Sequence, residues 1–198
     1  MQNKGSSFGQ SSLAENKNIS YVIVVGPSGV GKSTFAEKLS TQLNTLQSKD
    51  GRNIVSHVIN SDAYAKDHSQ EPRADVVDLD FDAPEEFKFD EFKGSVVSAL
   101  NGEQITIKPA AFSSQRGEGN KVIKPTMGSI LVCEGIHLLE DKEFVNGASC
   151  IINLSASNKT CIDRRTKRDA GALKEGVNVG GIDEGHKANP LFNKVEFD

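Results

Sequence analysis

One stretch, residues 22–34, constrains the fold of this chain more than any other. Four apolar residues open it and read as a buried strand, and residues 26–33 then match the pattern G-x-x-x-x-G-K-[S/T] at every fixed position. In such a loop, glycines let the backbone wrap closely around phosphate groups, backbone N–H groups converge on them, and the lysine neutralises their charge. The sequence therefore predicts a phosphate-binding loop between a strand and a helix.

The loop residues divide the work of holding a nucleotide. Lys32 is expected to face the β- and γ-phosphates, and the Ser33 hydroxyl is expected to reach Mg²⁺. The residues predicted to surround the phosphates are Gly26, Pro27, Ser28, Gly29, Val30, Gly31, Lys32, Ser33 and Thr34.

The composition indicates a globular chain with no membrane span. The net charge of −4 over 198 residues gives no general reason to expect nucleic acid or an anionic membrane as a partner. No run approaches the roughly 18 apolar residues of a transmembrane helix, and the N-terminus lacks the layout of a signal peptide. We therefore expect a cytoplasmic protein. Its oligomeric state stays open, a homo-oligomer included.

Two further features of the sequence are the N-terminal segment and the three cysteines. Residues 1–18 are rich in Ser, Gly, Asn and Gln and are predicted to form a flexible tail, which leaves residues 19–198 as one domain. The three cysteines lack C-x-x-C spacing, so neither a disulfide framework nor a zinc site is indicated. Cys133 and Cys150 lie in apolar runs and are expected to be buried packing residues.

Apolar periodicity predicts strands that alternate with helices. Strands are expected at residues 22–25, 53–61, 104–107, 128–135 and 150–154, and helices at 32–47, 84–100, 141–146 and 158–169. This alternation is typical of the α/β class, with a parallel sheet covered by helices on both faces. The strands at 22–25 and 53–61 are expected to form a parallel pair with a right-handed crossover.

Carboxylates follow two of these strands. In parallel sheets, ligands gather at the carboxyl ends of the strands, and Asp62 and Glu134 stand at two such ends. Asp62 is expected to accept the proton of an acceptor hydroxyl or to hold Mg²⁺, directly or through water. Glu134 is expected to serve the metal. A turn or cap role for Asp62 and an ordinary exposed position for Glu134 are the alternatives.

A basic run at residues 164–168 provides a third element. On a helix, Arg165 and Arg168, or Arg164 and Arg168, share a face. Planar guanidinium groups stabilise the spread charge of a transferring phosphoryl group well. Beside a phosphate-binding loop, the run predicts a short lid at about residues 158–185, and the alternative is a solvated basic helix face.

These motifs together resemble the uridine kinase and phosphoribulokinase family of P-loop kinases, and more closely its uridine kinase branch. The resemblance is collinear over about residues 21–197. Residues 61–67 resemble the segment with the catalytic aspartate, which matches Asp62. Residues 80–84 resemble an Asn-Phe-Asp-His-Pro signature whose aspartate, matching Asp82, holds the sugar hydroxyls. Residues 132–136 resemble the family's apolar-Glu-Gly strand end, and residues 164–169 resemble its arginine-rich lid helix.

The resemblance implies a P-loop NTPase fold and a kinase that uses ATP and Mg²⁺ to phosphorylate a hydroxyl of a small metabolite, either a nucleoside or a sugar-like alcohol. Ser33, Glu134 and Asp62 are the residues expected around Mg²⁺. The residues expected to act in phosphoryl transfer are Lys32, Asp62, Arg165 and Arg168, and those expected to contact the acceptor are Asp82, Tyr64 and Arg116.

The departures from the family pattern concern the acceptor. Ala65, Ala83 and Ala111 stand where uridine kinases carry side chains that contact the base, so the sequence does not favour uridine itself. Lys174 is the only cation where the family has Arg-Gly-Arg after the lid helix, and relatives continue beyond the position of Asp198 into another strand and helix.

Two other functions are alternatives. A P-loop switch GTPase needs a guanine-reading Asn-Lys-x-Asp, and residues 158–161 lack its aspartate. A non-catalytic nucleotide-binding or interaction protein is favoured by the alanines and the missing lid arginines and opposed by Asp62, Glu134 and Arg168. The choice between ATP and GTP as donor stays open.

Overall fold

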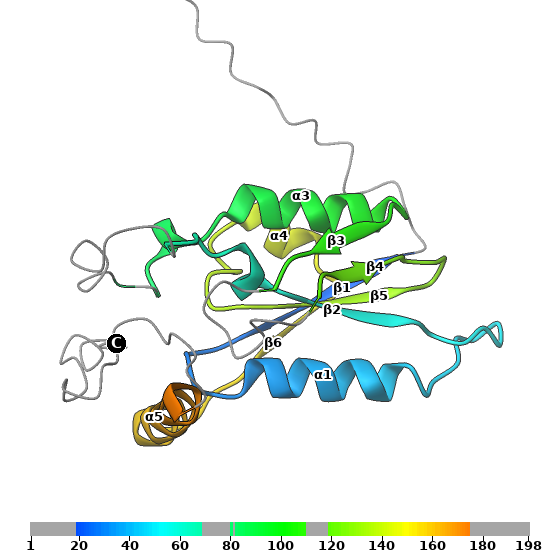
Figure 1. Ribbon diagram of the computed structural model, residues 1–198. Helices are drawn as coiled ribbons and strands as arrows, with labels where there is room; N and C mark the ends of the chain where they lie inside the picture. The colour runs from blue at the N-terminus through cyan, green and yellow to red at the C-terminus, as the bar shows by residue number, and fades with distance from the viewer. Residues whose placement is uncertain (1–18, 69–79, 81, 110–118, 175–198) are drawn as a thin grey trace, which may run out of the picture.

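The computed structural model describes residues 19–68, 80, 82–109 and 119–174, with side chains as far as Arg168 (Figure 1). The predicted N-terminal tail, the loop that contains Ala111 and Arg116, and the chain after Lys174 lie outside these residues.

A four-stranded parallel sheet forms the centre of the molecule. Its strands are β1 (Ser20–Val25), β2 (Ser56–Asn60), β5 (Ile130–Glu134) and β6 (Cys150–Asn153), in the spatial order β2-β5-β1-β6. The predicted parallel α/β architecture is confirmed. The expected direct pairing of the first two strands is wrong, because β5 lies between β1 and β2 and pairs with both. β5 takes a central place, where Leu131, Val132, Cys133 and Glu134 are buried.

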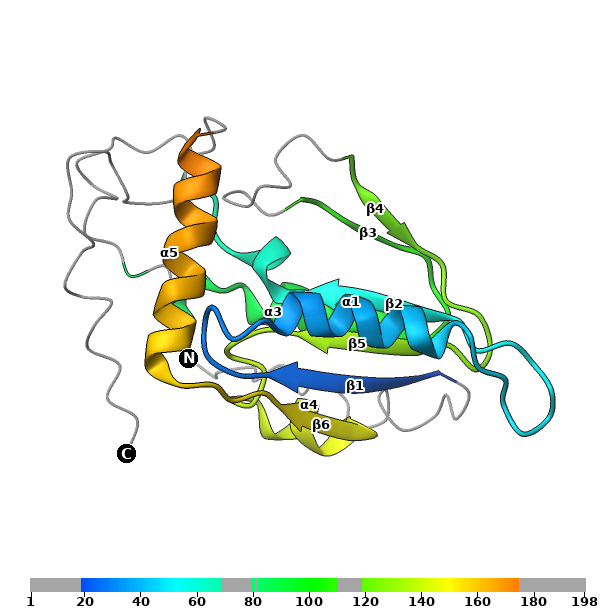
Figure 2. The same ribbon diagram turned by 90° about the horizontal axis from the view of Figure 1, so that it is seen from below.

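Helices cover both faces of this sheet (Figure 1). Helix α1 (Lys32–Leu43) packs on one face, where Val24, Val58 and Val132 form a small core with Ala36. Helices α3 (Phe89–Leu100) and α4 (Lys142–Gly147) lie on the other face over the larger core. The last described helix, α5 (Asn158–Lys174), runs across one end of the sheet (Figure 2).

Three helices differ from their expected bounds, and one of them, α5, extends to Lys174 instead of ending at residue 169. α1 ends at Leu43 instead of residue 47, because Asn44 caps it and the chain turns back so that Gln47 pairs with Asn53. As a result, Leu46 is not part of the packed face and is 51% exposed.

The helix expected at 84–100 is also broken. Pro84–Glu86 forms a single 3-10 turn, η2, and α3 begins only at Phe89. Between them the backbone is extended, since Lys88 N donates to Tyr64 O at 3.0 Å and Lys66 N donates to Glu86 O at 2.8 Å. This tertiary pairing overrides the local helix preference.

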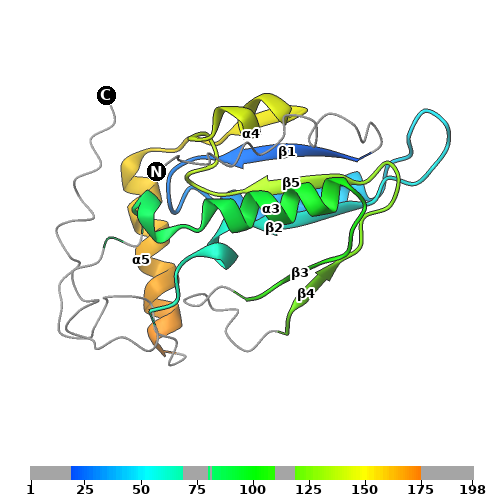
Figure 3. The ribbon, with the colours of Figure 1, turned by 90° about the horizontal axis from the view of Figure 1, so that it is seen from above.

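A two-stranded antiparallel hairpin, β3 (Ile105–Ile107) with β4 (Lys121–Ile123), lies on the β2 side of the sheet (Figures 2 and 3). β3 was expected, and β4 was not, because it is only three residues long and opens with lysine. A second correction concerns the cysteines: Cys133 is buried, whereas Cys150 is exposed at the start of the edge strand β6.

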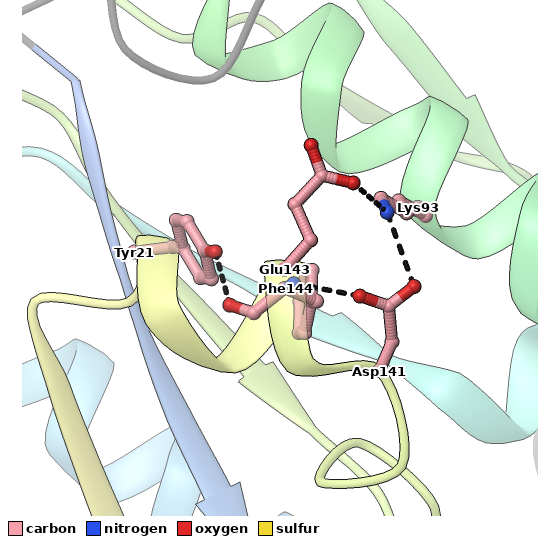
Figure 4. Close-up of polar contacts among 5 residues, drawn as sticks. All are labelled: Tyr21, Lys93, Asp141, Glu143 and Phe144. Carbon is pink, nitrogen blue, oxygen red and sulfur yellow. Dashed lines mark hydrogen bonds and ion pairs between the residues drawn. The ribbon is translucent and has the colours of Figure 1, made fainter. Parts of the chain in front are cut away.

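Polar contacts anchor the short helix α4 (Figure 4). The Tyr21 hydroxyl from β1 donates to Phe144 O, and burial raises the pKa of that hydroxyl. Lys93 from α3 pairs with Asp141 at 3.1 Å and with Glu143 at 2.6 Å. Asp141 also caps α4 by accepting from Phe144 N at 2.8 Å. A helix of six residues is not stable alone, so these contacts hold it in place.

Among the described residues, no helix is long and apolar enough to cross a membrane.

Candidate active site

The carboxyl ends of three neighbouring strands meet at one edge of the sheet, as the sequence predicted. β1 leads into the glycine-rich loop, β2 into the turn with Asp62, and β5 ends at Glu134. The strand register aligns Val24 and Asn60 with Glu134, so these three ends lie level with one another. α5 passes across the same edge (Figure 2).

The loop at residues 26–31 needs glycine for two separate reasons. Gly26, Gly29 and Gly31 have φ values of 144°, 80° and 105°, which side-chain-bearing residues rarely adopt. In addition, a Cβ at Gly26 would lie 2.4 Å from Leu154 O, and a Cβ at Gly29 would lie 2.4 Å from Cys161 O. The loop is therefore packed against the chain that leads from β6 into α5. The sequence motif did not predict this contact.

Lys32 opens α1 and lies half-buried within the loop. Its Nζ donates to Pro27 O at 3.1 Å, and Ser33 and Thr34 follow it, exposed, in the first turn of the helix. Desolvation lowers the pKa of this ammonium group, while the charges of Glu134, Asp62 and Asp82 raise it. Three carboxylates therefore surround the cation that is expected to face the nucleotide phosphates.

Glu134 is 1% exposed, and its Oε1 is buried without a hydrogen-bond partner. Burial, and then the charge of Asp62, raises the pKa of this carboxyl to about 7, although the Ser33 hydroxyl and Lys32 lower it. A buried carboxylate oxygen that has no partner and lies beside a serine hydroxyl fits a divalent cation. In the described part of the chain, no cluster of three or more His, Cys, Asp or Glu residues suits a metal alone. Mg²⁺ usually takes one or two carboxylates and completes its shell with phosphates and water.

Asp62 lies in the single turn η1 (Ser61–Tyr64), directly after β2. The Asn60 side chain accepts from Asp62 N at 2.7 Å and so caps the turn. Asp62 is exposed to solvent. Partial desolvation by the surrounding protein raises the pKa of its carboxyl group, whereas the positive charges of Lys32 and Arg168 lower it.

The arginines of α5 are directed to different partners. Arg165 pairs with the carboxylate of Asp82, and Arg164 Nη1 donates to Val30 O at 2.8 Å in the phosphate-binding loop. The charge of Arg168 acts on Lys32 and Asp62, which places it near the same edge. Of the two expected pairs, Arg165 with Arg168 is therefore the one near the carboxylates, while Arg164 braces the loop.

Two of the three expected acceptor residues lie in the described part of the chain. Asp82 lies near Lys32 and Asp62. The ring of Tyr64 packs edge-on against Phe92 at 5.4 Å between centroids, within the large core. Arg116 lies outside the described residues. One residue near Asp82 was missed: His137 Nε2 lies 2.7 Å from Asp82 O, a contact that no local sequence pattern signals.

A cavity of about 340 Å³ opens beside this edge, between the start of α1, the end of β2 and the β3–β4 hairpin. Ser33 and Glu134 line it together with Asn60, and the hairpin contributes Lys108 and Lys121. Tyr64 does not line it, and none of the described lining residues is aromatic. The volume suits a small ligand.

Comparison with known proteins agrees with this geometry. The model of the phosphoribulokinase / uridine kinase family matches residues 22–184. The uridine kinase of Aliivibrio salmonicida is 29% identical over 160 residues, which are 79% of this chain and 72% of that protein. The uridine kinase of Halalkalibacterium halodurans is 34% identical over 119 residues, which are 60% of this chain and only 52% of that protein.

A solved structure shows the same fold. A protein of Silicibacter sp. TM1040, described as a candidate fructose transport system kinase, superposes with a TM-score of 0.61 at 20% identity, covering 84% of this chain and 78% of the other. The family match spans most of the chain and includes the loop, both strand-end carboxylates and the arginine run. This chain therefore belongs to the phosphoribulokinase and uridine kinase family.

Proposed function

We propose that the protein is a kinase that transfers the γ-phosphate of ATP to a hydroxyl of a small metabolite. The observation that carries this proposal is the convergence of Lys32, Glu134 and Asp62 at one sheet edge, beside a glycine loop of the required shape. A protein that only bound nucleotide would need the loop and the lysine but not the exposed carboxylate at the end of β2.

In the proposed reaction, the acceptor hydroxyl oxygen forms a bond to the γ-phosphorus, and the bond from that phosphorus to the β–γ bridging oxygen breaks. Asp62 takes the hydroxyl proton, and ADP leaves. Lys32 and the loop N–H groups bind the phosphates, and Arg165 and Arg168 neutralise the transferring group. Mg²⁺ would be held by Ser33 and Glu134, with Asp62 as a further ligand directly or through water, and would supply neutralisation of the phosphate oxygens.

The acceptor site is proposed to include Asp82 and the adjacent cavity. Asp82 lies near Lys32 and Asp62, which suits a carboxylate that binds acceptor hydroxyls close to the transferred phosphate. The lack of aromatic side chains among the described cavity residues offers no surface on which a nucleobase stacks. Ala65 and Ala83, both half-buried near this region, likewise offer no polar contact. Of the two acceptor classes, these features favour a sugar-like alcohol over a nucleoside. Tyr64 and Arg116 stay proposed as neighbours of this site.

The second candidate is a nucleotide-binding protein without catalysis. The ion pair between Arg165 and Asp82 favours this candidate, because each side chain binds the other and neither is available to a substrate. A substrate-driven exchange of partners is required if the kinase proposal is right.

The test is ADP formation from ATP and Mg²⁺ across a panel of sugars, nucleosides, pantothenate-like alcohols and glycerate, with ATP affinity measured separately by calorimetry. The kinase proposal predicts ADP formation that depends on one acceptor class. ATP binding without ADP formation for any acceptor favours the binding-protein reading. The same panel run with GTP decides the donor.

A further inference from the structure

We propose that His137 is the positioning residue of the acceptor site, and that its imidazole Nε2 donates a hydrogen bond that holds the backbone of Asp82. The inference rests on the proposed function, because it assigns a partner to the carboxylate that is proposed to bind the acceptor.

The ring of His137 makes a polar contact at each nitrogen. Nε2 lies 2.7 Å from the backbone carbonyl oxygen of Asp82, and Nδ1 lies 2.6 Å from Oε1 of Glu140. The ring also stacks on Phe87, with centroids 6.4 Å apart and planes 27° from parallel. The side chain is 16% exposed, so water competes little for either nitrogen.

Both contacts require the histidine to donate. A carbonyl oxygen and an ionised carboxylate only accept hydrogen bonds, whereas a neutral imidazole has a single N–H. The geometry is satisfied in full only when both nitrogens carry a proton, and Glu140 then supplies the opposite charge. If the ring is neutral, one lone pair faces an acceptor, and one of the two contacts is lost.

The charged groups around the ring support this assignment. Glu140 lies on the same segment as His137, and the neighbouring segment contributes Asp82, whose own charge is paired with Arg165. Glu86, also in that segment, is directed to His68 and Lys66 on the other side. Glu140 is therefore the carboxylate in contact with this imidazole among the described residues.

The contact ties Asp82 to the strand end that carries Glu134. His137 follows β5 closely in the chain, so its hydrogen bond fixes the backbone of Asp82 relative to the end of that strand. The Asp82 carboxylate has a separate partner, Arg165, on the lid helix. When Arg165 exchanges Asp82 for a transferring phosphate, the His137 contact stays, and Asp82 remains in place for the acceptor.

Two substitutions separate the hydrogen bonds from the packing of the ring. His137→Phe keeps a ring against Phe87 but removes both donors. His137→Gln keeps an N–H near the position of Nε2, and Glu140→Ala removes the counter-charge but leaves the Asp82 contact. His57→Phe is the matched control, because His57 is a half-buried histidine of β2 that has no contact with Asp82 among the described residues.

The first readout is steady-state kinetics with the acceptor found in the panel. His137→Phe is expected to raise the acceptor KM about tenfold, the loss typical of a hydrogen bond from a charged donor. ATP affinity and the melting temperature should stay near those of the native protein, and His137→Gln should recover most of the loss.

The second readout does not need an acceptor. Hydrogen exchange measured by mass spectrometry should show faster exchange over residues 82–87 in His137→Phe, with no change in β1 or β5 and no such effect in His57→Phe. An unchanged acceptor KM, an equal loss of ATP affinity, or unchanged exchange overturns the inference. If no acceptor is phosphorylated, the proposed function fails, and the exchange experiment still decides whether His137 holds Asp82.

Discussion

Two parts of the proposed site lie at the same sheet edge and are built in different ways. The donor side is the loop at residues 26–31 with Lys32 and Glu134, and the acceptor side is Asp82 with the β3–β4 hairpin. The donor side stands on β1 and β5, the two strands with a neighbour on each side, and its loop is fixed by backbone contacts to Leu154 and Cys161. The proposed acceptor side stands beside the edge strand β2, where side-chain contacts add to the backbone pairing of Ala65 with Phe87: His137 and Arg165 contact Asp82, and Lys121 contacts Val58. The proposed phosphate-binding loop is thus held by backbone packing, whereas the proposed acceptor side depends more on individual side chains.

The largest expected effect is in the loop. Gly29→Ala adds a Cβ 2.4 Å from Cys161 O at a φ of 80°. We therefore expect ATP affinity to fall at least about tenfold. The free energy of unfolding should fall by more than the about 1–3 kcal/mol that a single strained residue costs. At this chain length, about 2–4 °C of melting temperature is lost per kcal/mol. Calorimetry with ATP and thermal unfolding measure the two effects.

Gly51→Ala is the matched control for that experiment. Gly51 has the same φ of 80°, and a Cβ there meets nothing within 4 Å. It should therefore show the backbone strain alone and normal ATP affinity. Equal losses in the two variants would mean that the packing of the loop against α5 contributes nothing.

The second effect concerns the buried carboxylate of the donor side. The pKa of Glu134 rises from 4.5 to about 7 in the folded protein, so the folded state binds this proton more tightly than the unfolded state. Native stability should then fall as the pH rises from about 4.5 to about 7, by at most about 3 kcal/mol. Glu134→Gln is neutral throughout and should be more stable than the native protein at pH 8 without Mg²⁺, with no difference near pH 4.5.

Urea unfolding at the two pH values measures this difference. The gain in stability should come with a loss of Mg²⁺-dependent ATP binding, as expected when a side chain serves function at the cost of stability. Glu103→Gln, at an exposed residue after α3, is the control and should change neither. A less stable Glu134→Gln protein at pH 8 would contradict the proposed environment of Glu134.

The smallest effect tests how the acceptor side is attached. Lys121 Nζ donates to Val58 O at 3.0 Å and so connects the hairpin to the edge of β2. Lys121→Met should cost about 0.5–1.5 kcal/mol, and hydrogen exchange in β4 should speed up while the loop and β1 are unaffected. Lys124→Met, at an exposed lysine just after β4, should have no effect. A loss of ATP affinity in Lys121→Met would contradict the claim that the donor side and the acceptor side are held independently.

The same division decides what the sequence could predict. The loop, Asp62 and Glu134 were predictable because parallel strands bring their carboxyl ends to one edge, whatever their order. The pairing of Arg165 with Asp82 was not, since the two residues are 83 positions apart and no periodicity joins them. The position of β5 between β1 and β2 was missed for a related reason, because strand order depends on which strand buries best and not on chain order.

Local signals also failed where tertiary contacts overrode them. The break before α3 follows from backbone pairing with the turn that carries Asp62, which a helix pattern at 84–100 does not reveal. The ring of Tyr64 packs against Phe92, and its expected contact with the acceptor stays a prediction. The role of Arg116 stays a prediction.

The most direct test of the account follows the fate of the γ-phosphate by ³¹P NMR, with native protein and Asp62→Asn in the presence of ATP, Mg²⁺ and the acceptor panel. We predict a growing phosphate monoester signal alongside ADP for the native protein. Asp62→Asn should bind ATP with native affinity and form the ester at least about a hundredfold more slowly, as expected for loss of a general base. Release of inorganic phosphate in place of an ester, or equal ester formation by Asp62→Asn, would contradict the account.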